Sequence, residues 1–292
     1  MGKATRRYHT LFVAPGVRTL FASSLIGRLP VGMAMLLFVL VVHAGTGSYT
    51  IAGLAAAANA AATAFCGPPL GRLSDRGHAS LILVLTGLAQ GATLVGLVVG
   101  LRMHLGGPAI IGIGAIAGVV NPPIAAVTRT VLPRLAPDVQ SRTTAFAMDA
   151  LLVEFTFVLG PALVGIVSAI WDGYTATLLA AALNVIGSLW LAAARSVRHG
   201  YREVAAQIRT SAPAHAGSRW RRLIGPLASG GLRIVLIVSV LEAAAFGVLE
   251  VAIPAYTNAR GLPQAGGLLF AIWSGGSIVG GLWYGEIGRA HV

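Results

Sequence analysis

The sequence predicts an all-α membrane protein, with a complete bundle of six membrane-spanning helices followed by the first two helices of a second bundle. Only 10% of the 292 residues are charged, whereas soluble domains carry about 25%. The chain is 56% hydrophobic, and its mean hydropathy is +0.80. This composition excludes an ordinary soluble protein, a disordered chain and a coiled coil. The 38 glycines follow no three-residue period, which excludes collagen.

Eight stretches are long enough to span a bilayer, which takes about 20 mostly apolar residues. No charged residue occurs between Arg28 and Arg72, and the turn Gly45–Ser48 divides this stretch into two spans. Trp171-Asp172-Gly173 divides a later apolar stretch in the same way. We therefore expect helices over 19–43, 50–70, 79–101, 107–129, 145–170, 174–194, 233–256 and 265–285.

The basic residues predict the orientation of these spans. With the N-terminus in the cytoplasm, 17 of the 21 Lys and Arg residues fall in cytoplasmic segments, and only Arg102 and Arg260 fall on the opposite face. Such an excess is typical of cytoplasmic loops. The net charge of +12 therefore indicates orientation beside anionic lipid rather than nucleic-acid binding. We expect a multi-pass protein of the plasma membrane.

A repeat relates the first two expected helices to the last two. At an offset of 215, Gly16, Arg18 and Gly32 match Gly231, Arg233 and Gly247, and at an offset of 214, Gly53, Leu54, Gly67 and Gly71 match Gly267, Leu268, Gly281 and Gly285. Parallel repeats are common in secondary transporters. The expected organisation is an N-terminal bundle over 1–194, a basic cytoplasmic linker over 195–232 and a partial second bundle over 233–285. Within the linker, 197–210 is either an amphipathic helix on the inner membrane surface or a solvated loop.

The turn after the second expected helix reads Gly71-Arg72-Leu73-Ser74-Asp75-Arg76-Gly77-His78. It resembles the loop signature of the major facilitator superfamily, although it is one residue short before Gly77 and has His78 where the family usually has Arg or Lys. The resemblance implies a cytoplasmic gate role for Gly71, Asp75 and Arg76. The alternative is a basic turn that only fixes topology.

The fifth expected helix contains the stretch Thr156–Gly165, which is similar to the Gly-Pro motif of the family's proton-linked exporters. The matching residues are Gly160, Pro161 and Gly165; Thr156 and Val164 replace two of the motif's glycines. The chain therefore resembles drug-efflux members of the family, which implies the family's fold and transport by alternating access. The alternative is a packing kink, because small residues permit close helix contact and proline bends a helix.

Five ionisable residues fall within the expected spans, where charge is costly and marks functional sites. They are Arg28, Asp149, Glu154, Glu242 and Glu250. Arg28, Glu154 and Glu242 each lie nine residues into their expected helices, at a depth of about 14 Å. We hypothesise that Arg28 pairs with Glu154, and that Glu154 or Glu242 couples transport to protons. Asp149 is expected nearer the cytoplasmic gate. A static structural salt bridge is the alternative.

Prolines interrupt the first, fourth and seventh expected helices at Pro30, Pro122-Pro123 and Pro254. Kinked helices at corresponding positions of two repeats often line a substrate cavity, and the resemblance implies the same three helices. Asn121 is therefore either a polar cavity residue or only a partner of the kink.

No motif for a metal, nucleotide or nucleophilic enzyme occurs. Cys66 is the single cysteine, and the seven histidines have no metal-ligand spacing. We expect no cofactor, no metal and no enzymatic activity. The expected partners are a small-molecule substrate, protons and the lipid bilayer, with no nucleic acid, and the chain is expected to be a monomer. An uptake permease, a membrane-embedded enzyme that uses Arg28, Glu154 and Glu242, and a non-transporting scaffold are the alternatives.

The end of the chain carries a separate expectation. The family resemblance implies twelve helices, and this sequence stops after eight expected spans. Residues 286–292 resemble the translation of a sequencing-adapter DNA. We therefore expect a non-native tail and a C-terminal truncation; a genuine short paralogue is the alternative.

Overall fold

A computed structural model describes residues 16–136, 138–210, 230–262, 265–270, 272–273 and 275–276. In this part of the chain all regular structure is helical. The helices are α2 (Val17–Thr46), α3 (Tyr49–Leu73), the π-helical turn η1 (Ser74–His78), α4 (Ala79–Arg102), α5 (Gly107–Val119), α6 (Ile124–Leu135), α7 (Val139–Ile170), α8 (Gly173–Ala193), α9 (Arg195–Thr210) and α11 (Gly230–Ala259). The expected tail 286–292, the linker stretch 211–229 and 277–285 lie outside the described residues.

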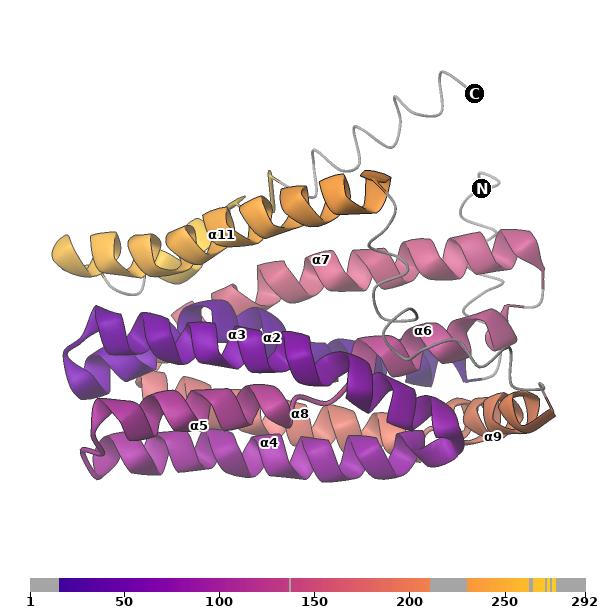
Figure 1. Ribbon diagram of the computed structural model, residues 1–292. Helices are drawn as coiled ribbons and strands as arrows, with labels where there is room; N and C mark the ends of the chain where they lie inside the picture. Colours follow the sequence, from indigo (N-terminus) through magenta and orange to yellow (C-terminus); the bar gives the residue numbers. More distant parts are fainter. Residues whose placement is uncertain are drawn as a thin grey trace, which may run out of the picture.

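The expected all-α membrane architecture is confirmed. Five helical stretches of the described residues are long and apolar enough to cross a membrane, or six when the bent helix α2 is included. One of them, Tyr49–Arg102, has 54 residues, and its chain turns back at η1 so that α3 and α4 both run along the bundle (Figure 1). Gly77 makes this turn possible with a φ of 97°, a conformation that glycine adopts without steric cost.

Two expected helices were wrong in their bounds. The expected helix 107–129 is two helices, α5 and α6, separated at Asn121-Pro122-Pro123, because consecutive prolines remove backbone donors and disfavour helix in the residue before them. The expected helix 145–170 starts six residues earlier, at Val139. Its N-cap is Asp138, whose carboxylate accepts a hydrogen bond from the Ser141 N–H at 2.8 Å.

Helix α2 lies at the centre of the bundle and packs against α8, α7 and α3. Small residues make these crossings close. A Cβ on Gly32 would collide with the Thr156 carbonyl of α7, and one on Gly160 would collide with the backbone of Gly32. Between α2 and α8, a Cβ on Gly187 would likewise collide with the backbone of Gly27. Packing of this kind is the main attraction between helices in a membrane, where burial of apolar surface supplies none.

The interior of the bundle consists of two apolar clusters with polar residues between them. One cluster gathers near Val17, Leu83 and Leu132, and the other near Leu37, Leu97 and Ile110. We call the two ends of the bundle the Val17 end and the Gly47 end, after the two ends of α2. The buried polar residues between the clusters include Ser24, Arg28, Gln90, Thr128, Asp149 and Asn184. Candidate functional groups therefore gather at mid-bundle.

Helix α9 caps the Val17 end of the bundle. It contacts η1 and α6, and its Val197 and Tyr201 side chains are buried. Of the two alternatives for 197–210, the structure has the helix, and these two side chains pack against the protein. The solvated-loop alternative was wrong for this segment.

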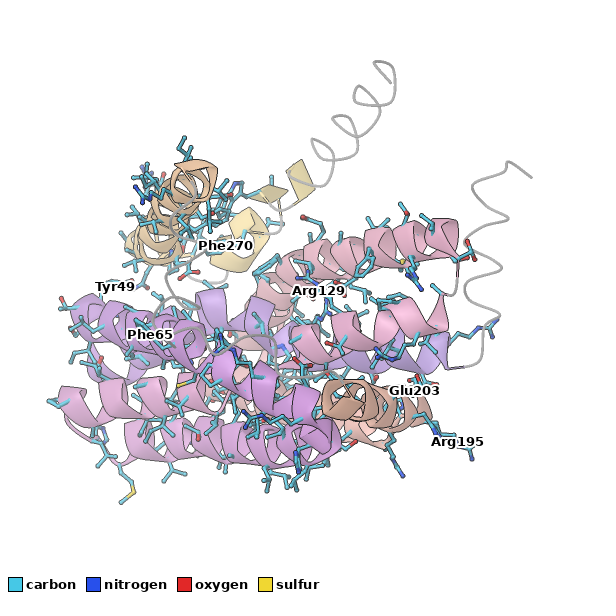
Figure 2. The ribbon with its side chains drawn as sticks, turned by 45° about the vertical axis from the view of Figure 1, so that its right-hand side comes forward. Tyr49, Phe65, Arg129, Arg195, Glu203 and Phe270 are labelled. Carbon is cyan, nitrogen blue, oxygen red and sulfur yellow. The ribbon has the colours of Figure 1, made fainter. Side chains whose placement is uncertain are left out.

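Within the described residues, the contacts of helix α11 with the bundle gather near the Gly47 end. Its residues from Gly230 to Leu249 are exposed except for the half-buried Leu232. Pro254 and Thr257 are buried, and the following segment inserts Phe270 fully into the apolar cluster at that end. Figure 2 shows Tyr49 and Phe270 at this end, and Arg195 and Glu203 at the other.

Candidate functional site

A cluster of three charged side chains lies between α2, α6 and α7. Arg28 donates from Nη2 to Oδ1 of Asp149 at 2.6 Å, and Arg129 donates from Nε to Oδ2 of the same carboxylate at 2.8 Å. The Asp149 side chain is 2% exposed and that of Arg28 6%, whereas that of Arg129 is 55% exposed. Two arginines thus share one buried carboxylate, with one arginine inside the bundle and the other at its surface.

The structure pairs Arg28 with Asp149, so the hypothesis of an Arg28–Glu154 pair was wrong. The reason is the start of α7. Arg28 is eleven residues after Val17 and Asp149 ten after Val139, which places both about 15 Å into helices that begin at the same end. Glu154 lies more than a turn deeper.

Arg129 was not among the predicted site residues, because it was counted as a loop charge. The available signal was the Asn-Pro-Pro sequence before it. Once the helix is broken there, a new helix starts at Ile124 and Arg129 lies inside it. Next to it, Thr128 donates to the Ser24 hydroxyl at 3.0 Å, so α2 and α6 share a second buried polar contact.

The other predicted cavity residues are not brought to this cluster. Glu154 is half-buried on α7 and Glu242 is exposed on α11. Neither takes part in an ion pair among the described residues, whose three ion pairs use Asp149 twice and Glu203 once. Asn121 is half-buried in the break between α5 and α6, and its backbone N–H donates to the Gly118 carbonyl at 3.3 Å.

The predicted gate turn lies under α9. Asp75 is half-buried and Arg76 is exposed. Gly71, which precedes them, lies in the last turn of α3. The Tyr201 side chain of α9 lies beside Asp75 and Thr130, and burial raises the pKa of its phenol to about 12. A second link joins α9 to α6, through Arg134 Nε and Glu203 Oε2 at 3.4 Å. Within the described residues the two carboxylate oxygens of Asp149 bind arginines and not this turn.

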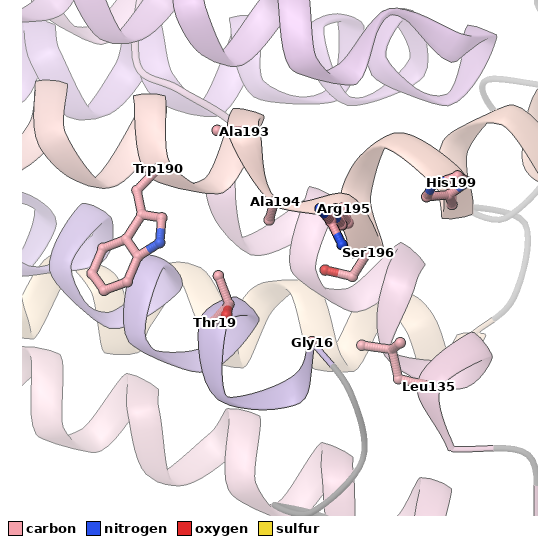
Figure 3. A pocket seen from close by; sticks show the side chains of 9 residues that line it. All are labelled: Gly16, Thr19, Leu135, Trp190, Ala193, Ala194, Arg195, Ser196 and His199. Atoms are coloured by element: carbon pink, nitrogen blue, oxygen red, sulfur yellow. The ribbon is translucent and has the colours of Figure 1, made fainter.

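A hollow of about 590 Å³ opens beside α9 at the Val17 end. Figure 3 shows Trp190 of α8, Thr19 of α2 and Arg195 of α9 around it. None of the predicted site residues lines this hollow. It belongs to the junction between the bundle and α9.

The predicted Gly-Pro motif forms a contact with the segment that follows α11. A Cβ on Gly267 would lie 2.8 Å from Gly165 Cα and 2.8 Å from the Pro161 carbonyl. Gly160 faces Gly32 of α2 on its other side. The motif therefore lets two neighbours approach α7 closely, which agrees with its packing interpretation and leaves transport direction open.

A polar contact that the sequence did not indicate joins α11 to the bundle at the Gly47 end. Asn258 donates from Nδ2 to the Tyr49 hydroxyl at 3.0 Å and lies 3.3 Å from His43 Nε2. The rings of His43 and Tyr49 stack with centroids 3.7 Å apart. These residues line a cavity of about 500 Å³ together with Ser168. No charge or motif marks them, because they become neighbours only through packing of α11.

Comparison with known families decides the class of the protein. The family model of the Major Facilitator Superfamily matches residues 20–290. The chain belongs to the Major Facilitator Superfamily. It is therefore a multi-pass membrane transporter of small molecules, and the family is not one of enzymes. A search of curated proteins finds no match.

Within this Major Facilitator Superfamily chain, the charge cluster and the one-ended contact of α11 are the two features that bear on transport. Buried ionisable groups in membrane helices usually serve a pathway. Among the described residues, the contacts between α11 and the bundle lie near one end.

Proposed function

We propose that the chain is a secondary active transporter that exports small amphipathic molecules in exchange for protons, by alternating access. The observation that carries the proposal is the one-ended contact of α11. Asn258, Gly267 and Phe270 join α11 and its following segment to the bundle near the Gly47 end, while the first twenty residues of α11 are exposed apart from the half-buried Leu232. Rocking about such a contact would open and close the other end.

In this proposal the Val17 end faces the cytoplasm of a plasma-membrane protein. The distribution of basic residues supports that orientation. Gly71, Asp75 and Arg76 then form a cytoplasmic gate beneath α9, and Gly160, Pro161 and Gly165 form the packing site of the second bundle on α7. The bundle 1–194, the linker 195–232 and the partial bundle 233–285 act together in a monomer.

The proton-coupling group in this proposal is Glu154 or Glu242. Asp149 is less suited to that role, because each of its two oxygens already accepts a hydrogen bond from an arginine. Glu154 and Glu242 form none of the ion pairs of the described residues.

A dye-accumulation assay tests the proposal. Cells that produce the chain are loaded with a panel of fluorescent amphipathic dyes, with and without a protonophore. We expect lower accumulation than in control cells, and we expect the protonophore to abolish the difference. Glu154→Gln or Glu242→Gln should abolish it as well, while Glu203→Gln, outside the membrane on α9, should not. Protonophore-sensitive export that survives in both variants would contradict the coupling role, and higher accumulation in producing cells would indicate uptake.

A further inference from the structure

The charge cluster of α2, α6 and α7 has an excess of positive charge. Arg28 and Arg129 share the single carboxylate of Asp149, and the only other ion pair of the described residues lies on α9. The cluster therefore has a formal charge of +1. Its buried pair, Arg28 and Asp149, is balanced, and the unbalanced guanidinium is that of Arg129 at the bundle surface.

Arg28 also has donors that the protein does not use. Its Nε and Nη1 atoms are buried and have no hydrogen-bond partner within the described part of the chain. The whole residue is 5% exposed, so water reaches these donors poorly. A guanidinium offers its donors in a planar fork that matches two oxygens of a carboxylate or phosphate. Asp149 accepts from Nη2 alone, so Nε and Nη1, which lie on different edges of the guanidinium, can each donate one hydrogen bond to a further acceptor.

The two arginines lie in series from the surface to the interior. Arg129 is 55% exposed, and its Nε binds the same carboxylate that Arg28 binds from inside. An anion arriving at the bundle surface would meet Arg129 first and then Arg28. Beside them, Phe146 lies three residues before Asp149 on α7 and is 42% exposed, so an apolar surface adjoins the charges.

From these observations we infer that the Arg28–Asp149–Arg129 cluster binds the anionic group of the transported molecule, which is an amphipathic organic carboxylate or phosphate ester. That the bound molecule is also transported rests on the proposed function, but the existence of the binding site does not. A bound monoanion would make two guanidinium groups face two anionic groups. It would also satisfy donors whose burial without a partner is unfavourable.

Equilibrium binding to the purified 292-residue chain in detergent tests the inference, with radiolabelled 2-naphthoate as the probe and 2-naphthamide as its neutral analogue. We expect saturable binding of the carboxylate and none of the amide at the same concentration. Arg28→Gln should weaken binding about thirtyfold or more, as loss of one partner in a buried charge pair does. Arg28→Lys should recover part of this loss, because it restores the charge without the fork.

Three further variants keep the result interpretable. The double variant R28Q/D149N removes both buried charges together and leaves neither unpaired, so it guards against a misfolded single variant. Arg129→Gln is at the surface and should weaken binding, while Asp149 keeps Arg28 as its buried partner. Arg102→Gln changes an arginine that lies over Tyr174 at the other end of the bundle and should bind as the parent does.

Equal binding of 2-naphthoate and 2-naphthamide would overturn the inference, as would full binding of the carboxylate by both R28Q/D149N and Arg129→Gln. Failure of the proposed function gives a different pattern. In that case the parent chain binds 2-naphthoate through Arg28, but proteoliposomes with an imposed proton gradient do not move it. Proton-driven movement of 2-naphthamide by Arg28→Gln would instead support transport and contradict selection of anions.

Discussion

Helices α2 and α11 have the same length and similar composition, yet they are placed very differently. Each has 30 residues and one internal proline, and they begin the two copies of the sequence repeat. Helix α2 is the centre of the bundle, whereas α11 is exposed over its first twenty residues. The repeat-related glycines show the contrast most directly, since Gly32 lies against Thr156 of α7 and Gly247 has no described atom within 4 Å of an added Cβ.

The difference shows what holds a membrane helix in place. Hydropathy does not distinguish α2 from α11, because lipid chains are as apolar as the protein interior. Close glycine crossings and a buried ion pair distinguish them, since only α2 has both. Helix α11 is held instead by Asn258, Pro254 and Thr257 near one end. A helix attached in that way is suited to movement.

The largest expected difference concerns the acidic residue of α7 that binds α2, Asp149, and the acidic residue of α11, Glu242. Asp149→Asn removes the charge that balances buried Arg28 and should lower the free energy of unfolding by about 3–5 kcal/mol. Glu242→Gln changes an exposed residue of α11 and should lower it by less than about 0.5 kcal/mol. Denaturant titrations in detergent, followed by tryptophan fluorescence, measure both. Equal effects would mean that the cluster does not stabilise the bundle.

The matched glycines should respond with opposite sign. Gly32→Ala forces a Cβ into the Thr156 carbonyl and should destabilise the chain by about 1–3 kcal/mol through overpacking. Gly247→Ala meets open space and should stabilise α11 by up to about 1 kcal/mol, because alanine favours helix over glycine. Thermal unfolding of the two purified variants compares them. A stabilised Gly32→Ala would contradict the close α2–α7 crossing.

The docking of α9 predicts a pH effect. Because the pKa of Tyr201 is raised from 10.0 to about 12, the folded chain holds this proton more tightly than the unfolded chain. The resulting stabilisation is complete below pH 10 and is lost as the pH rises towards 12. Spectrophotometric titration near 295 nm should find one of the six tyrosines ionising near pH 12, and Tyr201→Phe should remove that phase. If the phase near pH 12 persisted in Tyr201→Phe, the tyrosine with the raised pKa would be a different one.

The smallest effect is expected at the start of α8. Asp172 caps this helix by accepting a hydrogen bond from the Thr175 N–H at 2.6 Å, and that bond lowers the pKa of Asp172 below its ordinary value. Asp172→Ala should cost about 1 kcal/mol at neutral pH and Asp172→Asn less. Because the folded pKa is lowered, the contribution is present above about pH 4 and is lost as the pH falls through the folded value. A cost that does not change with acidification would contradict the cap.

The helices could be predicted from the sequence because charge-free stretches and turn residues mark them directly. Their bounds could not be predicted at two places. The start of α7 depends on the cap made by Asp138 and Ser141, which precedes the apolar stretch by several residues. The break between α5 and α6 depends on local backbone chemistry at Pro122 and Pro123, which an average over hydropathy does not register.

The candidate site was predicted in kind but not in its pairing. A charge in the first helix and acidic residues in the fifth indicated a buried pair, but the choice between Asp149 and Glu154 depended on a depth counted from the wrong helix start. Arg129 and the Asn258–Tyr49 contact escaped prediction. Both arise from packing between segments that are distant in sequence, and the hydropathy and charge pattern of one sequence does not show which distant segments pack together.

Movement of α11 is tested most directly by measuring the distance between α11 and the bundle at its two ends. Pulsed electron–electron double resonance between two spin labels measures each distance. In a Cys66→Ala background, one label pair sits at Thr50 and Ala259 near the Gly47 end, and another at Thr143 and Ile234 near the Val17 end; all four sites are exposed. We predict a short, narrow distance for the first pair and a long, broad one for the second, with opposite shifts when the pH is lowered in the presence of 2-naphthoate. Two distances that stay fixed, or change in the same direction, would contradict movement of α11 about its one-ended contact.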